Sequence, residues 1–124
     1  MKIALDFDGT CVTHEYPSIG KDIGSVEVIK ELVDNGHSIL LNTMRSGYSL
    51  DEAVRWFGSN GIPLYGVNND PDQIRWTKSS KTYADLYIDD AALGCPLMSD
   101  PVKSRNPFVD WKKVRLLLEK EHIL

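Results

Sequence analysis

Two pairs of acidic residues directly follow short apolar runs of this chain. Asp6 and Asp8 follow one run, and Asp89 and Asp90 follow another. Carboxylates that lie close together repel one another and raise each other's pKa unless a cation lies among them. Oxygen ligands without a nearby histidine favour Mg²⁺, which keeps several waters and leaves room for a phosphate. The acidic residues therefore predict a magnesium site, provided that the fold brings the two pairs together.

A carboxylate beside Mg²⁺ can attack phosphorus and form an aspartyl-phosphate that water later hydrolyses. Asp6 is the candidate nucleophile, and Asp8 could protonate the leaving oxygen and then deprotonate water. A hydroxyl group and a cation should hold the phosphoryl oxygens in the transition state. Thr43 and Lys81 are the candidates for these two functions, with Lys78 as an alternative cation.

Four further residues are candidates for supporting functions, and two of them, Arg45 and Asn68, have two interpretations each. Arg45 could contact a substrate phosphate or carboxylate in a bidentate manner, or pair with a surface acid. Gly9 permits a sharp bend that would let backbone N–H groups approach an anion. Asn68 could contact substrate or serve turn geometry, and Thr10 could simply cap a turn.

Short apolar runs predict four strands, and amphipathic segments predict helices between them. The predicted strands cover residues 2–5, 38–42, 64–67 and 85–88. This alternation indicates an α/β domain over residues 1–124, with a doubly wound, Rossmann-like parallel sheet, helices on both faces and strand order about 3-2-1-4. Because ligands bind beyond the carboxyl ends of such strands, the acidic pairs and Thr43 should meet at one edge.

Local signals place the ends of the helices. Ser25 is the expected N-cap of the first helix, and Ser49 with Glu52 has the spacing of a capping box for the second. A final helix is expected over residues 107–122, after a passage rich in Gly and Pro.

Composition narrows the function classes. The chain has 124 residues and a formal net charge of −4, which gives no basic surface for broad nucleic-acid binding. Cys11 and Cys95 have neither metal-ligand spacing nor the density of a disulfide scaffold, so reduced thiols in a cytoplasmic protein are expected. No apolar run reaches membrane-spanning length.

Four segments, in order, resemble the motifs of the haloacid dehalogenase-like (HAD) phosphatase superfamily. Asp6-Phe7-Asp8-Gly9-Thr10 resembles the first motif, Leu40-Leu41-Asn42-Thr43 the second, Lys81 the third, and Tyr87-Ile88-Asp89-Asp90 the fourth. The spacing between these motifs is too short for a cap domain. The chain therefore looks like a capless member, close to short bacterial or phage magnesium-dependent phosphatases.

The resemblance implies the roles of the acidic residues. Asp6 would be the nucleophile and Asp8 the general acid and base. Mg²⁺ would be held by the Asp6 carboxylate, the Asp8 main-chain carbonyl and Asp89, with Asp90 in support. The expected substrate is a phosphorylated small molecule or an exposed phosphate on a larger one, and a second subunit could supply a lid in a homo-oligomer.

Other functions remain open at this point. A signalling receiver domain also places acids beside Mg²⁺, but its phosphorylated aspartate ends a middle strand, where this chain has Thr43. A phosphate-binding regulatory module without turnover is a further alternative. Transfer of the phosphoryl group to an acceptor other than water would share the first half-reaction.

Overall fold

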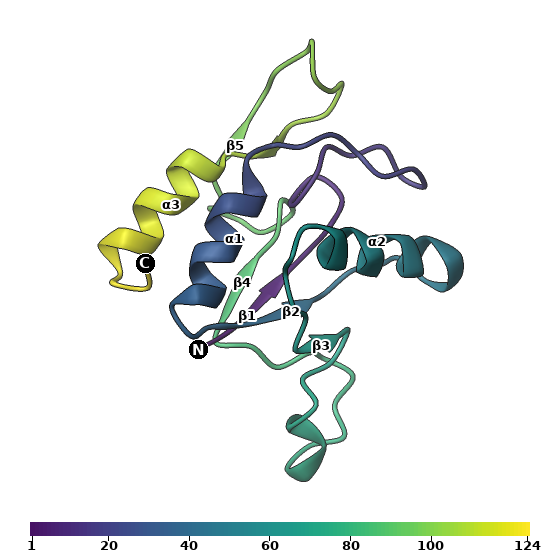
Figure 1. Cartoon of the computed structure of the whole chain (residues 1–124), viewed down its shortest axis with the longest axis vertical. Coiled ribbons are helices and arrows are strands. Elements are labelled where there is room, and N and C mark those ends of the chain that lie inside the picture. Colours follow the sequence, from purple (N-terminus) through teal and green to yellow (C-terminus); the bar gives the residue numbers. More distant parts are fainter.

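The computed structural model describes residues 1–124, and a parallel four-stranded sheet lies at its centre (Figure 1). The sheet has the order β3-β2-β1-β4. Its strands are β1 (Lys2–Leu5), β2 (Ser38–Leu41), β3 (Gly66–Val67) and β4 (Leu86–Ile88). The predicted α/β class and strand order are confirmed.

β1 is a central strand, so it hydrogen-bonds to β2 on one side and to β4 on the other. Leu5 is aligned with Leu41 of β2 and with Ile88 of β4. Because the three strands are parallel and in register at this point, the residues that follow them emerge side by side. This alignment brings the segments after Leu5, Leu41 and Ile88 to the same edge of the sheet.

Three α-helices cover one face of the sheet. They are α1 (Ser25–Asp34), α2 (Gly47–Ser59) and α3 (Trp111–Lys120). Their buried residues belong to the same apolar cluster as alternate residues of β1, among them Ile3 and Leu5. The chain moves from β1 to β2 to β3 in one direction, and right-handed crossovers then place α1 and α2 on the same side.

The return crossover from β3 to β4 covers the opposite face, below the strands in Figure 1. Its only helical element is the 3₁₀ helix η1 (Gln73–Arg75). Helices were expected on both faces of the sheet, but this face carries only a single 3₁₀ turn and no α-helix. Residues 68–82 are polar and contain Pro71, which accounts for the missing α-helix.

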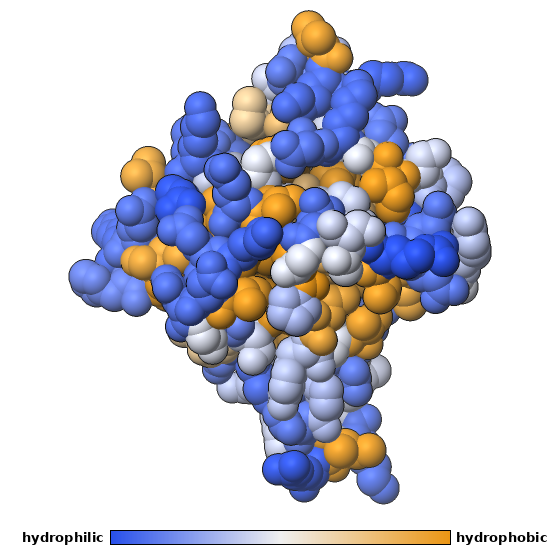
Figure 2. Space-filling view, in the orientation of Figure 1, coloured by the Kyte–Doolittle hydropathy of each residue, from blue (hydrophilic) through white to orange (hydrophobic).

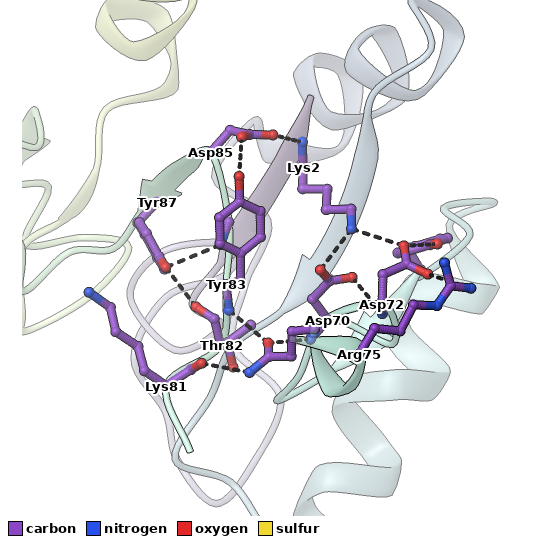
Figure 3. A network of polar contacts seen from close by, with 12 residues as sticks. Lys2, Asp70, Asp72, Arg75, Lys81, Thr82, Tyr83, Asp85 and Tyr87 are labelled. Atoms are coloured by element: carbon purple, nitrogen blue, oxygen red, sulfur yellow. Dashed lines mark hydrogen bonds and ion pairs between the residues drawn. The ribbon is translucent and has the colours of Figure 1, made fainter. Parts of the chain in front are cut away.

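Polar contacts hold this crossover to the sheet (Figure 3). The Lys2 ammonium lies 2.7 Å from a carboxylate oxygen of Asp70 and 2.9 Å from one of Asp72. The buried side chain of Gln73 donates to the main-chain oxygens of Ser79 and Lys81. Side-chain hydrogen bonds and ion pairs therefore take the place of the main-chain hydrogen bonds that an α-helix would have formed.

Three helix starts differ from the predictions. α1 begins at Ser25 with Gly24 at its N-cap position, and the Ser25 hydroxyl donates to the Cys11 main-chain oxygen at 2.6 Å instead of capping the helix. α2 begins at Gly47 with Ser46 at its N-cap position, so the predicted capping box of Ser49 and Glu52 does not form. The Ser49 hydroxyl instead donates to the Ser46 main-chain oxygen. α3 begins at Trp111 instead of residue 107, because the preceding residues are part of a second, smaller sheet.

That smaller sheet is an antiparallel pair of β5 (Leu97–Met98) and β6 (Phe108–Val109). It lies beside the loop that follows β1, because the Val109 N–H donates to the Gly9 main-chain oxygen at 2.9 Å. Sequence analysis predicted only an irregular passage here. Two-residue strands carry too little apolar periodicity to be recognised in a sequence.

The surface is mixed in character. Figure 2 shows hydrophilic residues over much of α1 and α3, with apolar residues visible between the elements. No helix has the length and apolarity that crossing a membrane requires.

Candidate functional site

Three carboxylates meet at the carboxyl end of the sheet. Asp6 follows β1, whereas Asp89 and Asp90 follow β4, and one oxygen from each lies within 4.8 Å of the others. The pairing of β1 with β4 produces this cluster from two distant parts of the sequence. Three of the four predicted carboxylates therefore converge, whereas the Asp8 carboxylate lies outside the cluster and pairs with Arg45.

The cluster has unusual electrostatics. Burial raises the pKa of Asp6 to about 7, against an ordinary value of 3.8, and the negative charge of Asp89 contributes in the same direction. Burial also raises the pKa of Asp90. Half-buried carboxylates held this close favour either a shared proton or a bound cation.

Thr10 connects two members of the cluster. Its hydroxyl donates to Oδ2 of Asp6 at 2.7 Å and accepts the Asp90 N–H at 3.0 Å. The bond to Asp6 partly offsets the effect of burial on the Asp6 pKa. Sequence analysis gave Thr10 only a capping function, because nothing in its spacing showed that β4 would end beside it.

Gly9 allows Asp90 to approach the loop after β1. Its φ is +80°, and a Cβ at this position would lie 2.3 Å from Oδ2 of Asp90. The Gly9 N–H donates to the Val12 main-chain oxygen at 2.8 Å, so it is committed to the turn. Gly9 thus shapes the cluster by its small size and left-handed backbone, and its own N–H is not available to an anion.

Asp8 forms a bidentate ion pair with Arg45. Nε of Arg45 donates to Oδ2 of Asp8 at 2.8 Å, and one terminal nitrogen donates to Oδ1 at 2.7 Å. Arg45 is buried, so this pair differs from the surface pairing considered above. The bond to Asp8 raises the pKa of Arg45, which fixes its positive charge.

The remaining donors of Arg45 bind main-chain oxygens. They reach Ser18 at 2.7 Å, Pro17 at 3.0 Å and Ser49 at 3.1 Å. All five N–H groups of the guanidinium are therefore used within the protein. Arg45 fastens the loop between β1 and α1, here called the flap (residues 13–20), to the start of α2 and has no donor left for a substrate.

Thr43 lies at the end of β2, where its side chain lines the cleft above the acidic cluster. The Asn68 side-chain oxygen accepts the Thr43 N–H at 2.8 Å. The Thr43 hydroxyl in turn accepts a hydrogen bond from the main-chain N–H of Arg45 at 3.1 Å. Asn68 thus positions the loop that carries Thr43, and its side chain does not line the cleft.

Lys81 lies in the crossover before β4, away from the lining of the cleft. Its ammonium is 5.6 Å from the centre of the Tyr87 ring and forms no ion pair. Lys78 is exposed in the same crossover. Neither predicted lysine is joined to the acidic cluster by a hydrogen bond or an ion pair.

The cluster lies in an open cleft of about 570 Å³. Besides the predicted residues, His14 and Tyr16 of the flap region line it. Their spacing carries no motif, so sequence analysis did not assign them a site. Arg45 holds the flap beside the cleft through the main-chain oxygens of Pro17 and Ser18.

The donor set fits a hard divalent cation. Every candidate ligand in the cluster is a carboxylate oxygen, and the main-chain oxygen of Asp8 accepts no hydrogen bond from the protein. Oxygen donors of this kind suit Mg²⁺ better than zinc or copper. The predicted ligands Asp6, Asp8 and Asp89 are consistent with this chemistry.

The chain was compared with known proteins. No family model and no curated protein matches it. A solved structure described as a conserved protein coded by a locus of Bacteroides thetaiotaomicron is similar, with a TM-score of 0.79. The match covers 98% of this chain and 91% of that one, at 36% sequence identity, so the chain belongs to the same family as this conserved Bacteroides thetaiotaomicron protein.

Proposed function

We propose that the chain is a magnesium-dependent phosphomonoester hydrolase of the HAD-like type, without a cap domain. The observation that carries the proposal is the meeting of Asp6, Asp89 and Asp90 within 4.8 Å at the carboxyl end of the sheet. Asp6 also lies in an open cleft with Asp8 and Thr43, where a phosphate could reach its carboxylate. The free thiols Cys11 and Cys95 accord with a cytoplasmic location.

In the proposal, Mg²⁺ is held by the Asp6 carboxylate, the Asp8 main-chain oxygen and Asp89. Asp90 is linked to these ligands through Thr10. The Thr10 hydroxyl donates to the Asp6 carboxylate and accepts the main-chain N–H of Asp90, which holds both residues in position. When bound, Mg²⁺ neutralises the negative charge that the carboxylates and the phosphoryl oxygens bring together. Its charge also favours the ionised form of Asp6, which the burial of that side chain disfavours.

The ionised Asp6 then attacks phosphorus through one carboxylate oxygen, and the bond between phosphorus and the ester oxygen breaks. Water hydrolyses the resulting aspartyl-phosphate, with Asp8 accepting its proton. The bidentate bonds from Arg45 hold both oxygens of the Asp8 carboxyl group in place beside the cleft. Asp8 is the proposed donor of the proton that the leaving oxygen takes up in the first half-reaction, and it takes a proton from water in the second.

The phosphoryl oxygens need a hydroxyl and a cation. Thr43 lines the cleft and supplies the hydroxyl. Arg45 cannot supply the cation, because its donors are used within the protein. Lys81 remains the proposed cation because it lies eight residues before Asp89, as in the third motif of the superfamily that the chain resembles. Its ammonium lies over the Tyr87 ring.

The proposal is tested with p-nitrophenyl phosphate, whose leaving group departs without an acid. We expect hydrolysis that requires Mg²⁺. In Asp6→Asn, kcat should fall at least about a thousandfold, since that change removes the nucleophile. Asp51→Asn, an exposed change on α2, is the matched control and should retain full activity. Wild-type protein denatured during turnover should contain one phosphoryl group on the peptide with Asp6.

Two outcomes would overturn the proposal. Equal turnover in wild type and Asp6→Asn would exclude the aspartyl-phosphate route. No turnover with stable binding of beryllofluoride and Mg²⁺ would instead indicate a binding module. The lysine that holds the phosphate is identified by comparing kcat of Lys81→Met with kcat of Lys78→Met. The variant with the larger loss of kcat lacks that lysine.

A further inference from the structure

A second hollow of about 330 Å³ adjoins the cleft of Asp6. The two spaces share His14 and Tyr16, so a molecule in the cleft can extend directly into the hollow. The other lining residues are Glu15, Arg105 and Asn106. The hollow is thus placed where the part of a substrate that leaves the phosphate would lie.

Two segments far apart in the sequence form this hollow, and hydrogen bonds fasten them to each other. The flap region supplies one wall, and the loop between β5 and β6 supplies the other. The Lys21 ammonium donates to the Lys103 main-chain oxygen at 2.8 Å, and the Val109 N–H donates to Gly9 at 2.9 Å. These two bonds lie beside the hollow and hold the chain segments that flank its walls next to each other.

Tyr16 stands between the cleft and the hollow. The Arg45 guanidinium lies 5.2 Å from the centre of its ring, and Arg45 is itself held by Asp8 and the flap. Tyr16 nevertheless remains 55% exposed, which leaves ring surface available. A ring supported in this way offers a flat surface against which a sugar or a base can pack.

The polar groups of the hollow are balanced in charge. Arg105 supplies donors, Glu15 supplies acceptors, and the Asn106 amide supplies both. Neither Arg105 nor Glu15 forms an ion pair, and the Asn106 side chain has no hydrogen bond in the protein. The charges of Arg105 and Glu15 offset each other, so the hollow gives an anion no net attraction. An apolar group would displace water from all three side chains without replacing its hydrogen bonds.

A neutral group with several hydroxyls satisfies donors and acceptors together. We propose that this hollow binds the sugar portion of a sugar phosphate or nucleotide while its phosphate lies beside Asp6. This inference rests on the proposed function, which it extends from the reacting phosphate to the class of leaving group. Arg105 and Asn106 are then specificity-determining residues, and Tyr16 supports the ring.

Binding is measured by calorimetry with Mg²⁺ and Asp6→Asn protein, which does not turn substrate over under the proposed function. Glucose 6-phosphate and adenosine monophosphate should each bind at least about tenfold more tightly than hexyl phosphate, the equivalent of one well-made charged hydrogen bond. Adding Arg105→Ala or Asn106→Ala should remove most of that preference. Neither change should alter the affinity for inorganic phosphate.

Arg75→Ala is the matched control, because Arg75 is exposed on η1, on the opposite face of the sheet. Equal affinities for the hexyl and sugar compounds would overturn the inference, as would an unchanged preference in both variants. A loss that extends equally to inorganic phosphate would also overturn it. Tighter binding of adenosine monophosphate than of glucose 6-phosphate would assign the Tyr16 ring to a base as well as a sugar.

Turnover of p-nitrophenyl phosphate by the wild type separates this inference from the proposed function. Hydrolysis without a sugar preference would leave the phosphatase in place and reject the hollow as a sugar site. A sugar preference that depends on Arg105, without any hydrolysis, would support the hollow and reject the phosphatase.

Discussion

Removing the Arg45 guanidinium should destabilise the protein strongly. Its side chain is 1% exposed and that of Asp8 is 12% exposed, so the pair lies largely outside solvent. Removing one partner of a buried ion pair typically costs about 3–5 kcal/mol, because the other charge is left uncompensated. We expect Arg45→Met to lower the free energy of unfolding by that amount, since Asp8 and three main-chain oxygens lose their donor together.

A double-mutant cycle separates the ion pair from the bonds to the flap. Asp8→Asn leaves Arg45 with its three main-chain acceptors, so this single change should cost less than Arg45→Met. The double variant should be more stable than the sum of the single effects predicts, by about 1–3 kcal/mol, because residues in contact do not act independently. Urea denaturation at constant pH, followed by circular dichroism, measures all four proteins.

Arg55→Met is the matched control for the cycle. Arg55 is exposed on α2 and contacts only the Tyr48 ring, so its loss should cost less than about 1 kcal/mol. A cost below about 1 kcal/mol for Arg45→Met would refute the reasoning, since a buried charge cannot lose its partner so cheaply. Strict additivity of the Arg45 and Asp8 changes would refute the ion pair itself.

Three further predictions concern the acidic cluster. In metal-free protein, the folded state keeps a proton on Asp6 from about pH 4 up to its pKa of about 7, whereas the unfolded state has lost it. The free energy of unfolding should therefore fall across this pH range by at most about 4 kcal/mol. Urea unfolding in the presence of EDTA measures this decline, which Asp6→Asn should flatten, and an unchanged slope in the variant would contradict the prediction. Thr10→Val should raise the Asp6 pKa further and cost about 1–3 kcal/mol, measured by NMR titration of the Asp6 carboxyl carbon and by urea unfolding. Gly9→Ala should displace Asp90 and weaken Mg²⁺ binding at least about tenfold in thermal-shift titrations. Gly36→Ala shares the positive φ but meets open space, so it should cost only about 1–2 kcal/mol and leave Mg²⁺ binding intact.

Much of the sheet could be predicted because its strands are short, apolar and separated by clear helical periodicity. Asp6 and Asp89 could be placed together by topology alone, since both follow strands of one parallel sheet. The sequence also predicted Thr43 at the same edge, where it lines the cleft. These residues share a signal that depends only on the order of elements along the chain.

The remaining features depend on side-chain packing, which the order of elements does not determine. Arg45 could be recognised as a candidate, but its choice of Asp8 as partner depends on where the flap folds back. The polar residues 68–82, with Pro71, already indicate a loop or a broken turn of helix between β3 and β4, which η1 confirms. The Lys2 network that holds this crossover has no motif that would mark it in the sequence. The hollow at Arg105 depends on a hairpin whose strands are two residues long.

The central position of β1 has a consequence for synthesis of the protein. The strand that precedes Asp6 is made before both of its partners, because it pairs with β2 on one side and with the much later β4 on the other. During translation the growing chain must keep this apolar strand available until residue 88 has emerged. The carboxylate cluster can therefore form only after Asp89 and Asp90 have been made, and a nascent chain that stops before Asp89 holds an incomplete site.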